Sequence, residues 1–138
     1  GVIHHTPDPR IGFLEVARVV KPGGTLFLSV YGKGGFGWLV NDLFRYTICK
    51  IVPFSVMNKI WALTGIPSNK RYVILDNLYV PYCFRFTEAE VREWLHSAGF
   101  DGIRRVKFER YDYESIWSRI RHGEGWLQFY AEKSGKKA

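Results

Sequence analysis

Two adjacent histidines, His4 and His5, are the first residues of this chain whose chemistry stands out. They follow a short apolar run, residues 1–3, which has the composition of a strand end. Open α/β sheets bind ligands at the edge where parallel strands end, so a histidine there could orient a bound molecule or accept its proton near neutral pH. The alternative is that one histidine packs or caps the loop, with Thr6 either a ligand contact or part of the turn.

Residues 32–37 read Gly-Lys-Gly-Gly-Phe-Gly, which has the G-x-G-x-x-G spacing of a dinucleotide-binding loop. That motif needs an acidic residue about 20 positions further on, and residues 52–57 contain no carboxylate. A helical pattern follows the glycines, where the motif requires a second parallel strand. We therefore reject a dinucleotide site and expect a mobile hinge that leads into a lid.

The composition argues against several other kinds of site. Cys49 and Cys83 lie far apart and belong to no Cys/His cluster, so we predict no metal site. The formal net charge of +7 is spread from Arg10 to Lys137, which is more typical of a solvated surface than of a nucleic-acid footprint. No signal peptide and no run of about 20 apolar residues is visible, so we expect a cytoplasmic protein without a transmembrane segment.

The first half of the chain has clear signals for a helix and a strand. Asp8 is a good N-cap and Pro9 suits the first helical position, which predicts a helix over residues 9–19. The sequence Lys-Pro-Gly-Gly at 21–24 ends that helix. The nearly continuous apolar run over 25–31 predicts a central parallel strand covered by helices on both faces.

A strand end, a helix, a tight turn and a buried strand make up half of a doubly wound sheet. We therefore expect Val2 and Phe27 to lie in neighbouring parallel strands. A right-handed helical crossover that includes Leu14 would join them.

The second half of the chain is mostly helical in pattern. Thr87 and Glu90 have the spacing of a capping box at the start of a helix. Residues 71–84 are aromatic and irregular, and we assign them no element. In chain order, we predict helices over 38–51, from 56 to about 64, over 86–99 and over 113–121, and strands over 103–110 and 126–133.

Three segments resemble class I S-adenosylmethionine-dependent methyltransferases, of the kind called type 11. Residues 1–9, GVIHHTPDP, resemble the end of that family's fourth strand and the following loop. Residues 21–26, KPGGTL, resemble its turn into the fifth strand, and residues 86–100, from FTEAE to AGF, resemble the helix before its sixth strand. The segments occur in the family's order and spacing, which is more specific than any one motif.

This resemblance implies an α/β fold, the C-terminal part of a Rossmann-like doubly wound sheet. It would hold strands four to seven, with the last strand antiparallel. Residues 1–138 would be one partial methyltransferase domain, and residues 32–86 a helical lid insert between the fifth strand and the following helix. The family's glycine-rich cofactor loop would lie upstream of Gly1. We therefore treat the sequence as a fragment that is inactive and marginally stable by itself.

The resemblance also implies S-adenosylmethionine as cofactor and methyl transfer to a small-molecule acceptor. His4 and His5 are the candidate catalytic residues, and Val2, His4 and Thr6 are candidate cofactor contacts. The aromatic insert favours a hydrophobic or amphipathic acceptor, because aromatic side chains line apolar pockets, although most of these rings could simply pack the lid onto the sheet. The candidate acceptor contacts are Tyr31, Lys33, Asp76, Tyr79, Tyr82 and Arg85.

Two other classes of function stay open. The chain could belong to a non-catalytic, methyltransferase-like subunit that dimerises with an active one, which a degenerate upstream glycine loop would support. It could also be a basic module that binds nucleic acid, whose affinity would fall steeply with salt. The hypothesis that the protein is a methyltransferase is also compatible with a homodimer.

Overall fold

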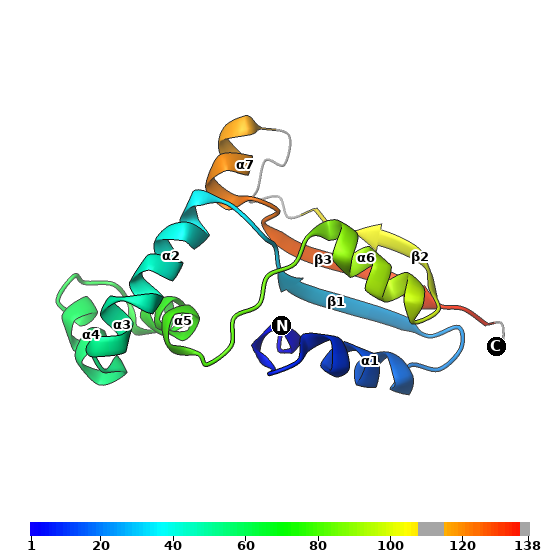
Figure 1. The fold of residues 1–138 in the computed structure, drawn as a ribbon, viewed down its shortest axis with the longest axis horizontal. Helices are drawn as coiled ribbons and strands as arrows, with labels where there is room; N and C mark the ends of the chain where they lie inside the picture. The colour runs from blue at the N-terminus through cyan, green and yellow to red at the C-terminus, as the bar shows by residue number, and fades with distance from the viewer. Residues whose placement is uncertain (108–114, 136–138) are drawn as a thin grey trace.

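The computed structural model describes residues 1–107 and 115–135. Three strands and two helices form one end of the molecule, and the helices of the insert form the other (Figure 1). Helix α7 (Ile116–His122) lies beside the start of the insert.

The sheet consists of β1 (Thr25–Tyr31), β2 (Phe100–Arg105) and β3 (Trp126–Lys133), in the order β1-β3-β2. Strand β3 is antiparallel to both neighbours, which confirms that the last strand is antiparallel. Strands β1 and β2 therefore run in the same direction. Their carboxyl ends lie at one edge of the sheet, together with the beginning of β3.

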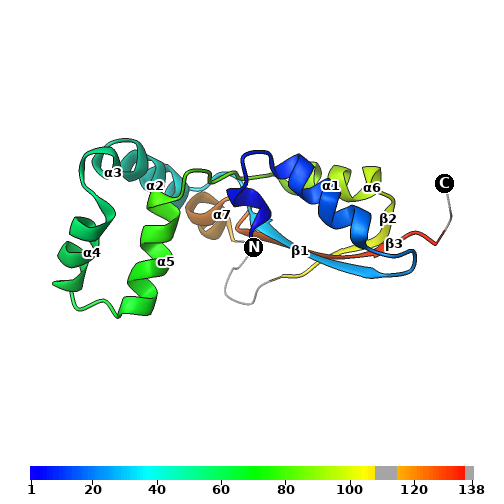
Figure 2. The ribbon, with the colours of Figure 1, turned by 90° about the horizontal axis from the view of Figure 1, so that it is seen from below.

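Two helices cover one face of this sheet (Figure 2). Helix α1 (Pro9–Val19) has the predicted bounds, and the Asp8 carboxylate caps it by accepting a hydrogen bond of 3.0 Å from the Ile11 amide. Helix α6 (Glu88–Ser97) begins with the predicted capping box. There the Thr87 amide donates to Glu90 over 2.6 Å, and the Glu90 amide donates to the Thr87 hydroxyl over 3.2 Å.

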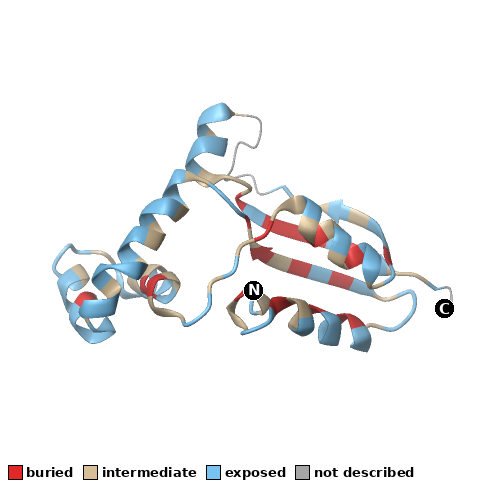
Figure 3. Ribbon diagram, in the orientation of Figure 1, coloured by how far each residue is buried: buried red, intermediate tan, exposed pale blue. Residues whose placement is uncertain are grey.

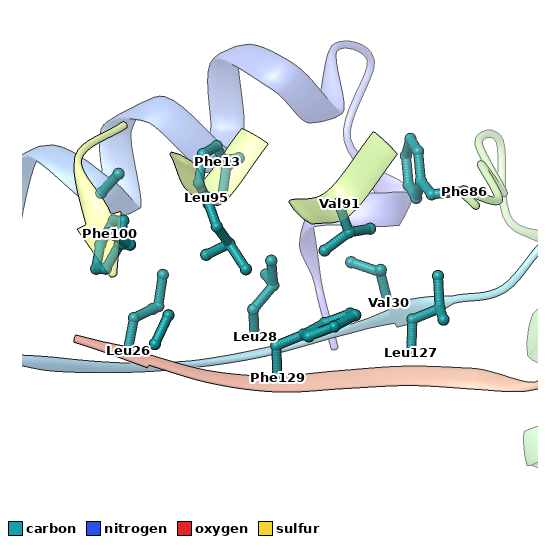
Figure 4. Close-up of a cluster of buried hydrophobic side chains, with 12 residues drawn as sticks. Phe13, Leu26, Leu28, Val30, Phe86, Val91, Leu95, Phe100, Leu127 and Phe129 are labelled. Atoms are coloured by element: carbon teal, nitrogen blue, oxygen red, sulfur yellow. The ribbon is translucent and has the colours of Figure 1, made fainter. Parts of the chain in front are cut away.

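The main core lies between these helices and the sheet (Figure 4). Phe13 of α1, Leu95 of α6, and Phe129 and Leu127 of β3 are fully buried there. Phe100 closes the same core at the start of β2. Burial of such side chains is the main driving force for this half of the fold.

The strand expected at residues 1–3 is absent. Residues Ile3–His5 form a short 3-10 helix, and Val2 is 73% exposed. Here the backbone satisfies its polar groups locally, since the His5 amide donates to the Val2 carbonyl over 2.9 Å. The prediction that Val2 and Phe27 occupy neighbouring parallel strands is therefore wrong for this chain.

The prediction that β1 is covered on both faces is also wrong for the described residues. Leu26, Leu28 and Val30 point into the core (Figure 4). Phe27, on the opposite face, is 48% exposed. Its ring packs against Tyr130 of β3, with 4.9 Å between the ring centroids. The burial of β1 thus alternates, because both helices lie on one side of the sheet.

The insert consists of shorter helices than its sequence pattern predicted. The helix expected over 38–51 is interrupted at Thr47, whose hydroxyl donates to the Leu43 carbonyl over 2.5 Å. A helix also occupies most of the segment left unassigned. In chain order the insert has α2 (Phe36–Tyr46), α3 (Ile48–Ile51), α4 (Phe54–Ala62) and α5 (Ser68–Tyr79).

Two boundaries differ near the C-terminus. The strand predicted over 103–110 starts at Phe100 and ends at Arg105. Its pairing with β3 sets these bounds, since Phe100 lies opposite Lys133 and Arg105 lies opposite Phe129. Residues 108–110 of that prediction, and residues 113–114 of the predicted helix over 113–121, lie outside the described residues.

Candidate functional site

Aromatic side chains gather where β1 ends and β3 begins. Tyr31 is the last residue of β1 and pairs in register with Trp126, the first residue of β3. Their ring centroids are 5.9 Å apart, and Trp38 of α2 lies 5.1 Å from Tyr31. Strands β1 and β2, which run in the same direction on either side of β3, both end at this edge of the sheet.

His4 is buried against this cluster, with only 2% of its surface exposed. Its ring centroid lies 4.0 Å from that of Tyr31 and 4.2 Å from that of His5. Burial, followed by the charge of His5, lowers the pKa of His4 to about 4, so the ring is neutral at pH 7. Neither ring nitrogen has a hydrogen-bond partner among the described residues. Both nitrogens are therefore buried polar atoms that the described residues leave unsatisfied, which is uncommon in folded proteins.

His5 is oriented by the segment that precedes α6. Its Nδ1 lies 2.8 Å from the Tyr82 carbonyl oxygen. A carbonyl only accepts hydrogen bonds, so Nδ1 carries the proton and Nε2 has a free lone pair in the neutral ring. Of the two histidines, His5 is therefore the better placed to accept a proton.

Tyr31 joins the two histidines to the insert. Burial, together with the charges of Cys83 and Asp76, raises the pKa of its phenol. The hydroxyl therefore keeps its proton at neutral pH and can donate a hydrogen bond. Asp76 of α5 thus acts on the Tyr31 phenol through its charge.

Arg85 fastens α2 to the segment before α6. Its guanidinium donates to both carboxylate oxygens of Asp42, over 2.6 and 2.5 Å, and lies 4.1 Å from the centre of the Trp38 ring. Two donors on one carboxylate define a fixed geometry. This arrangement assigns Arg85 a role in holding Trp38 against Tyr31.

The structure brings His4, His5, Tyr31, Tyr82 and Arg85 together, and it places four other candidates elsewhere. Val2 points to solvent, and the Thr6 hydroxyl donates to the Ile3 carbonyl over 2.7 Å. Lys33 is exposed, with its ammonium 3.9 Å from Glu90. The Tyr79 hydroxyl donates to the Val52 carbonyl over 2.7 Å, inside the separate small core of the insert.

Sequence reasoning missed a second feature of the same edge, a basic hollow of about 610 Å³. Strand β2 ends there at Arg105, and α7 contributes Arg119 and two isoleucines. The residues that line the hollow are distant in sequence. They meet because β1 and β2 end at the edge where β3 begins, and the Glu124 amide donates to the Lys33 carbonyl there over 2.9 Å. The hollow is lined by Lys33, Arg105, Ile116, Arg119, Ile120, Gly123 and Glu124.

The glycine segment 32–37 packs closely on the turn before β3. The Gly32 amide donates to the Gly125 carbonyl over 2.8 Å. A Cβ on Gly35 would lie 2.5 Å from the Gly123 nitrogen, so the two backbones can approach only without side chains. The glycines therefore have a packing function, and the expected hinge motion stays a prediction.

The described residues do not by themselves form a cradle for S-adenosylmethionine. Val2 and Thr6, two of the three predicted contacts, are respectively turned to solvent and bonded within their own turn. Only His4 offers unused polar atoms. The three residues thus do not fit a cofactor site as the sequence predicted it.

Residues 1–107 and 115–135 contain neither a metal-binding cluster nor a membrane-spanning helix. No three His, Cys, Asp or Glu side chains there are grouped so that they could hold a metal ion. No helix in these ranges has the length and apolar character needed to cross a membrane.

Comparisons with known proteins test the resemblance to methyltransferases. No family model matches the chain. A ubiquinone biosynthesis O-methyltransferase of Klebsiella pneumoniae subsp. pneumoniae is 36% identical over 52 residues, which cover 38% of this chain and 22% of the relative. The protein of the same description in Escherichia coli K12 is 35% identical over the same length. The chain is related to the class I methyltransferases. The match spans about a fifth of these relatives' length.

Among solved structures, the chain resembles one from Haloferax volcanii, described as a complex between the Trm112 methyltransferase activator and a methyltransferase. The superposition has a TM-score of 0.46 at 17% identity, and it covers 96% of this chain and 50% of the other. The methyltransferase relationship therefore depends on the sequence matches and the motifs.

Proposed function

We propose that the protein transfers a methyl group from S-adenosylmethionine to a small, hydrophobic or amphipathic acceptor. In this proposal the chain supplies the acceptor side of the site, corresponding to strands four to seven, with residues 32–86 as the lid. The related proteins are described as O-methyltransferases of ubiquinone biosynthesis, which favours a hydroxyl group as the methylated position.

The observation that carries the proposal is the ring cluster of His4, His5 and Tyr31 at the carboxyl edge of the sheet. Methyl transfer depends mainly on aligning two reactants and excluding water from between them. Aromatic rings of this kind give an apolar surface with a few polar atoms. The lid residue Trp38 extends that surface on the insert side.

The proposed roles of the three side chains in this cluster follow from which of their atoms carry a proton. His5 accepts the proton of the acceptor hydroxyl at Nε2, since its Nδ1 is engaged with the Tyr82 carbonyl. His4, neutral at pH 7, accepts a hydrogen bond and orients the same molecule. Tyr31 donates a hydrogen bond from its protonated phenol.

S-Adenosylmethionine would supply the methyl group, and the resemblance places its main contacts in a glycine-rich loop and an acidic residue that this chain does not contain. The residues described here orient the acceptor, exclude water and hold its proton. The rest of the cofactor site is assigned to other parts of the protein.

The test uses the protein with its full natural sequence. Calorimetry with S-adenosylmethionine should show one site, and an alkyl-substituted catechol should accept a labelled methyl group. His5→Gln should lower kcat by about 100-fold, the lower range for general-base catalysis, without changing cofactor affinity.

The matched control is His96→Gln, which changes an exposed histidine of α6 and should leave kcat unchanged. If the full protein does not bind S-adenosylmethionine, the enzyme assignment fails and a non-catalytic, methyltransferase-like subunit becomes the better explanation. If both variants behave alike, His5 is not the base.

A further inference from the structure

One extended segment, residues 80–86, joins the insert to the ring cluster, and we call it the strap. It follows α5 and runs from the insert to the start of α6 (Figure 1). None of residues 80–85 is buried (Figure 3), and the rings of Tyr82 and Phe84 are 42% and 39% exposed. Burial of side chains therefore contributes little to the position of the strap, and its hydrogen bonds must hold it.

On the sheet side, the strap binds both histidines of the candidate site. The Phe84 amide donates to the His4 carbonyl over 2.9 Å. The Tyr82 carbonyl, two residues earlier, lies 2.8 Å from Nδ1 of His5. The proton position on His5 thus depends on where the strap places one carbonyl group.

On the insert side, α2 binds the strap before and after that carbonyl. The Arg45 guanidinium donates to two strap carbonyls, among them that of Pro81 over 3.1 Å. Further along, Arg85 of the strap donates to both carboxylate oxygens of Asp42, over 2.6 and 2.5 Å. Hydrogen bonds that involve a charged group are the stronger kind. The contact with His5 therefore lies between two charged attachments to one helix.

We propose that α2 determines which nitrogen of His5 carries the proton, with Arg45 as a positioning residue. While α2 is docked on the strap, the Tyr82 carbonyl accepts from Nδ1 and leaves Nε2 without a proton. When α2 leaves the strap, that carbonyl is no longer fixed, and the ring can place its proton on either nitrogen. His5 is then a base only while the lid helix is docked, an inference that rests on the proposed function.

This arrangement links acceptor binding to the state of the base. Trp38, on the same helix, lies 5.1 Å from Tyr31 and extends the apolar surface of the ring cluster. A hydrophobic acceptor that contacts Trp38 binds the docked arrangement more tightly. A ligand shifts such an equilibrium by its difference in affinity for the two states. The acceptor thereby favours the state in which Nε2 is ready to take its proton.

The experiment observes the His5 ring directly, by long-range nitrogen–proton NMR of the protein with its full natural sequence. Spectra are recorded at about pH 8, where an ordinary histidine is neutral, and His5→Gln identifies the His5 signals. The natural protein should carry the proton on Nδ1. In Arg45→Gln, the ratio of Nδ1-protonated to Nε2-protonated ring should fall at least about fivefold, the factor that one ordinary hydrogen bond contributes to an equilibrium.

The matched control is Arg71→Gln. Arg71 of α5 is also a partly buried arginine of the insert whose guanidinium donates to a backbone carbonyl, that of Ile66, but both residues lie outside the strap. This variant should keep the natural proton position. Asp42→Asn, which weakens the second attachment of the strap, should shift the ratio in the same direction as Arg45→Gln. Thermal melts establish that each variant is folded.

The proposal is overturned if His5 of the natural protein carries its proton on Nε2, a result that does not depend on any variant. It is also overturned if Arg45→Gln and Arg71→Gln give the same ratio of the two ring forms. Methyl transfer is a separate readout, in which kcat should fall in Arg45→Gln and stay unchanged in Arg71→Gln. A shift of the proton in Arg45→Gln, with no methyl transfer by the natural protein, would support the control of His5 by α2 and refute the proposed function.

Discussion

Replacing Asp42 with asparagine should lower the free energy of unfolding by about 2 kcal/mol, within the range for hydrogen bonds to charged groups. The Asp42 carboxylate receives two hydrogen bonds from Arg85, and the side chains of the pair are only 31% and 14% exposed. The substitution keeps the side-chain volume and removes the charge, so the largely buried Arg85 is left without its counter-ion. A fully buried pair would lose about 3–5 kcal/mol, and the partial exposure of Asp42 reduces that value.

The matched control is Glu15→Gln. Its carboxylate pairs with Arg18 at 2.8 Å, but these side chains are 62% and 71% exposed. Solvent screens such a pair, so its loss should change stability by less than about 0.5 kcal/mol. Both variants thus make the same chemical change, from carboxylate to amide, in two different environments.

The assay is urea denaturation at pH 7, followed by circular dichroism and fitted for both midpoint and slope. Arg85→Lys and the double variant complete a cycle, and the coupling between the two sites should be at least about 1 kcal/mol. Equal effects of Asp42→Asn and Glu15→Gln, or a coupling near zero, would refute the claim that this ion pair holds α2 in place.

The two remaining predictions concern a glycine and a buried histidine. Gly123→Ala should destabilise by more than about 2 kcal/mol, because its Cβ would lie 2.3 Å from the Gly34 carbonyl carbon. Gly99→Ala, with φ of +76° and open space around it, should lose only about 1 kcal/mol in the same urea assay. Because burial lowers the pKa of His4 from 6.5 to about 4, the unfolded chain binds its proton first, and stability should fall as pH drops from 6.5 to about 4. His4→Gln should flatten this dependence of stability on pH. If the variant and the natural protein lose stability equally between pH 6.5 and about 4, the burial of His4 is not the cause of that loss.

Local signals in the sequence determined several elements with their bounds. Asp8 and Pro9 define the start of α1, and Thr87 with Glu90 defines the start of α6, because capping is decided by residues a few positions apart. The apolar runs of β1 and β3 were predicted at their observed residues. The family resemblance, and the antiparallel direction of the last strand that it implied, also came from the sequence.

The candidate site was predicted only in part. The sequence indicated His4, His5 and Tyr31, because each lies beside the end of an expected strand. It did not indicate that burial would suppress protonation of His4, or that the Tyr82 carbonyl would fix the proton of His5. Both effects depend on segments that are distant in the chain.

The tertiary structure decided the directions in which elements face. A periodic pattern shows that α2 has an apolar and a polar side, but the inward side was set by Asp42 with Arg85 and by Arg45 with backbone carbonyls. In the same way, the apolar run of β1 did not reveal that Phe27 would lie on an open face. Periodicity defines the faces of an element, and only its long-range contacts determine what each face meets.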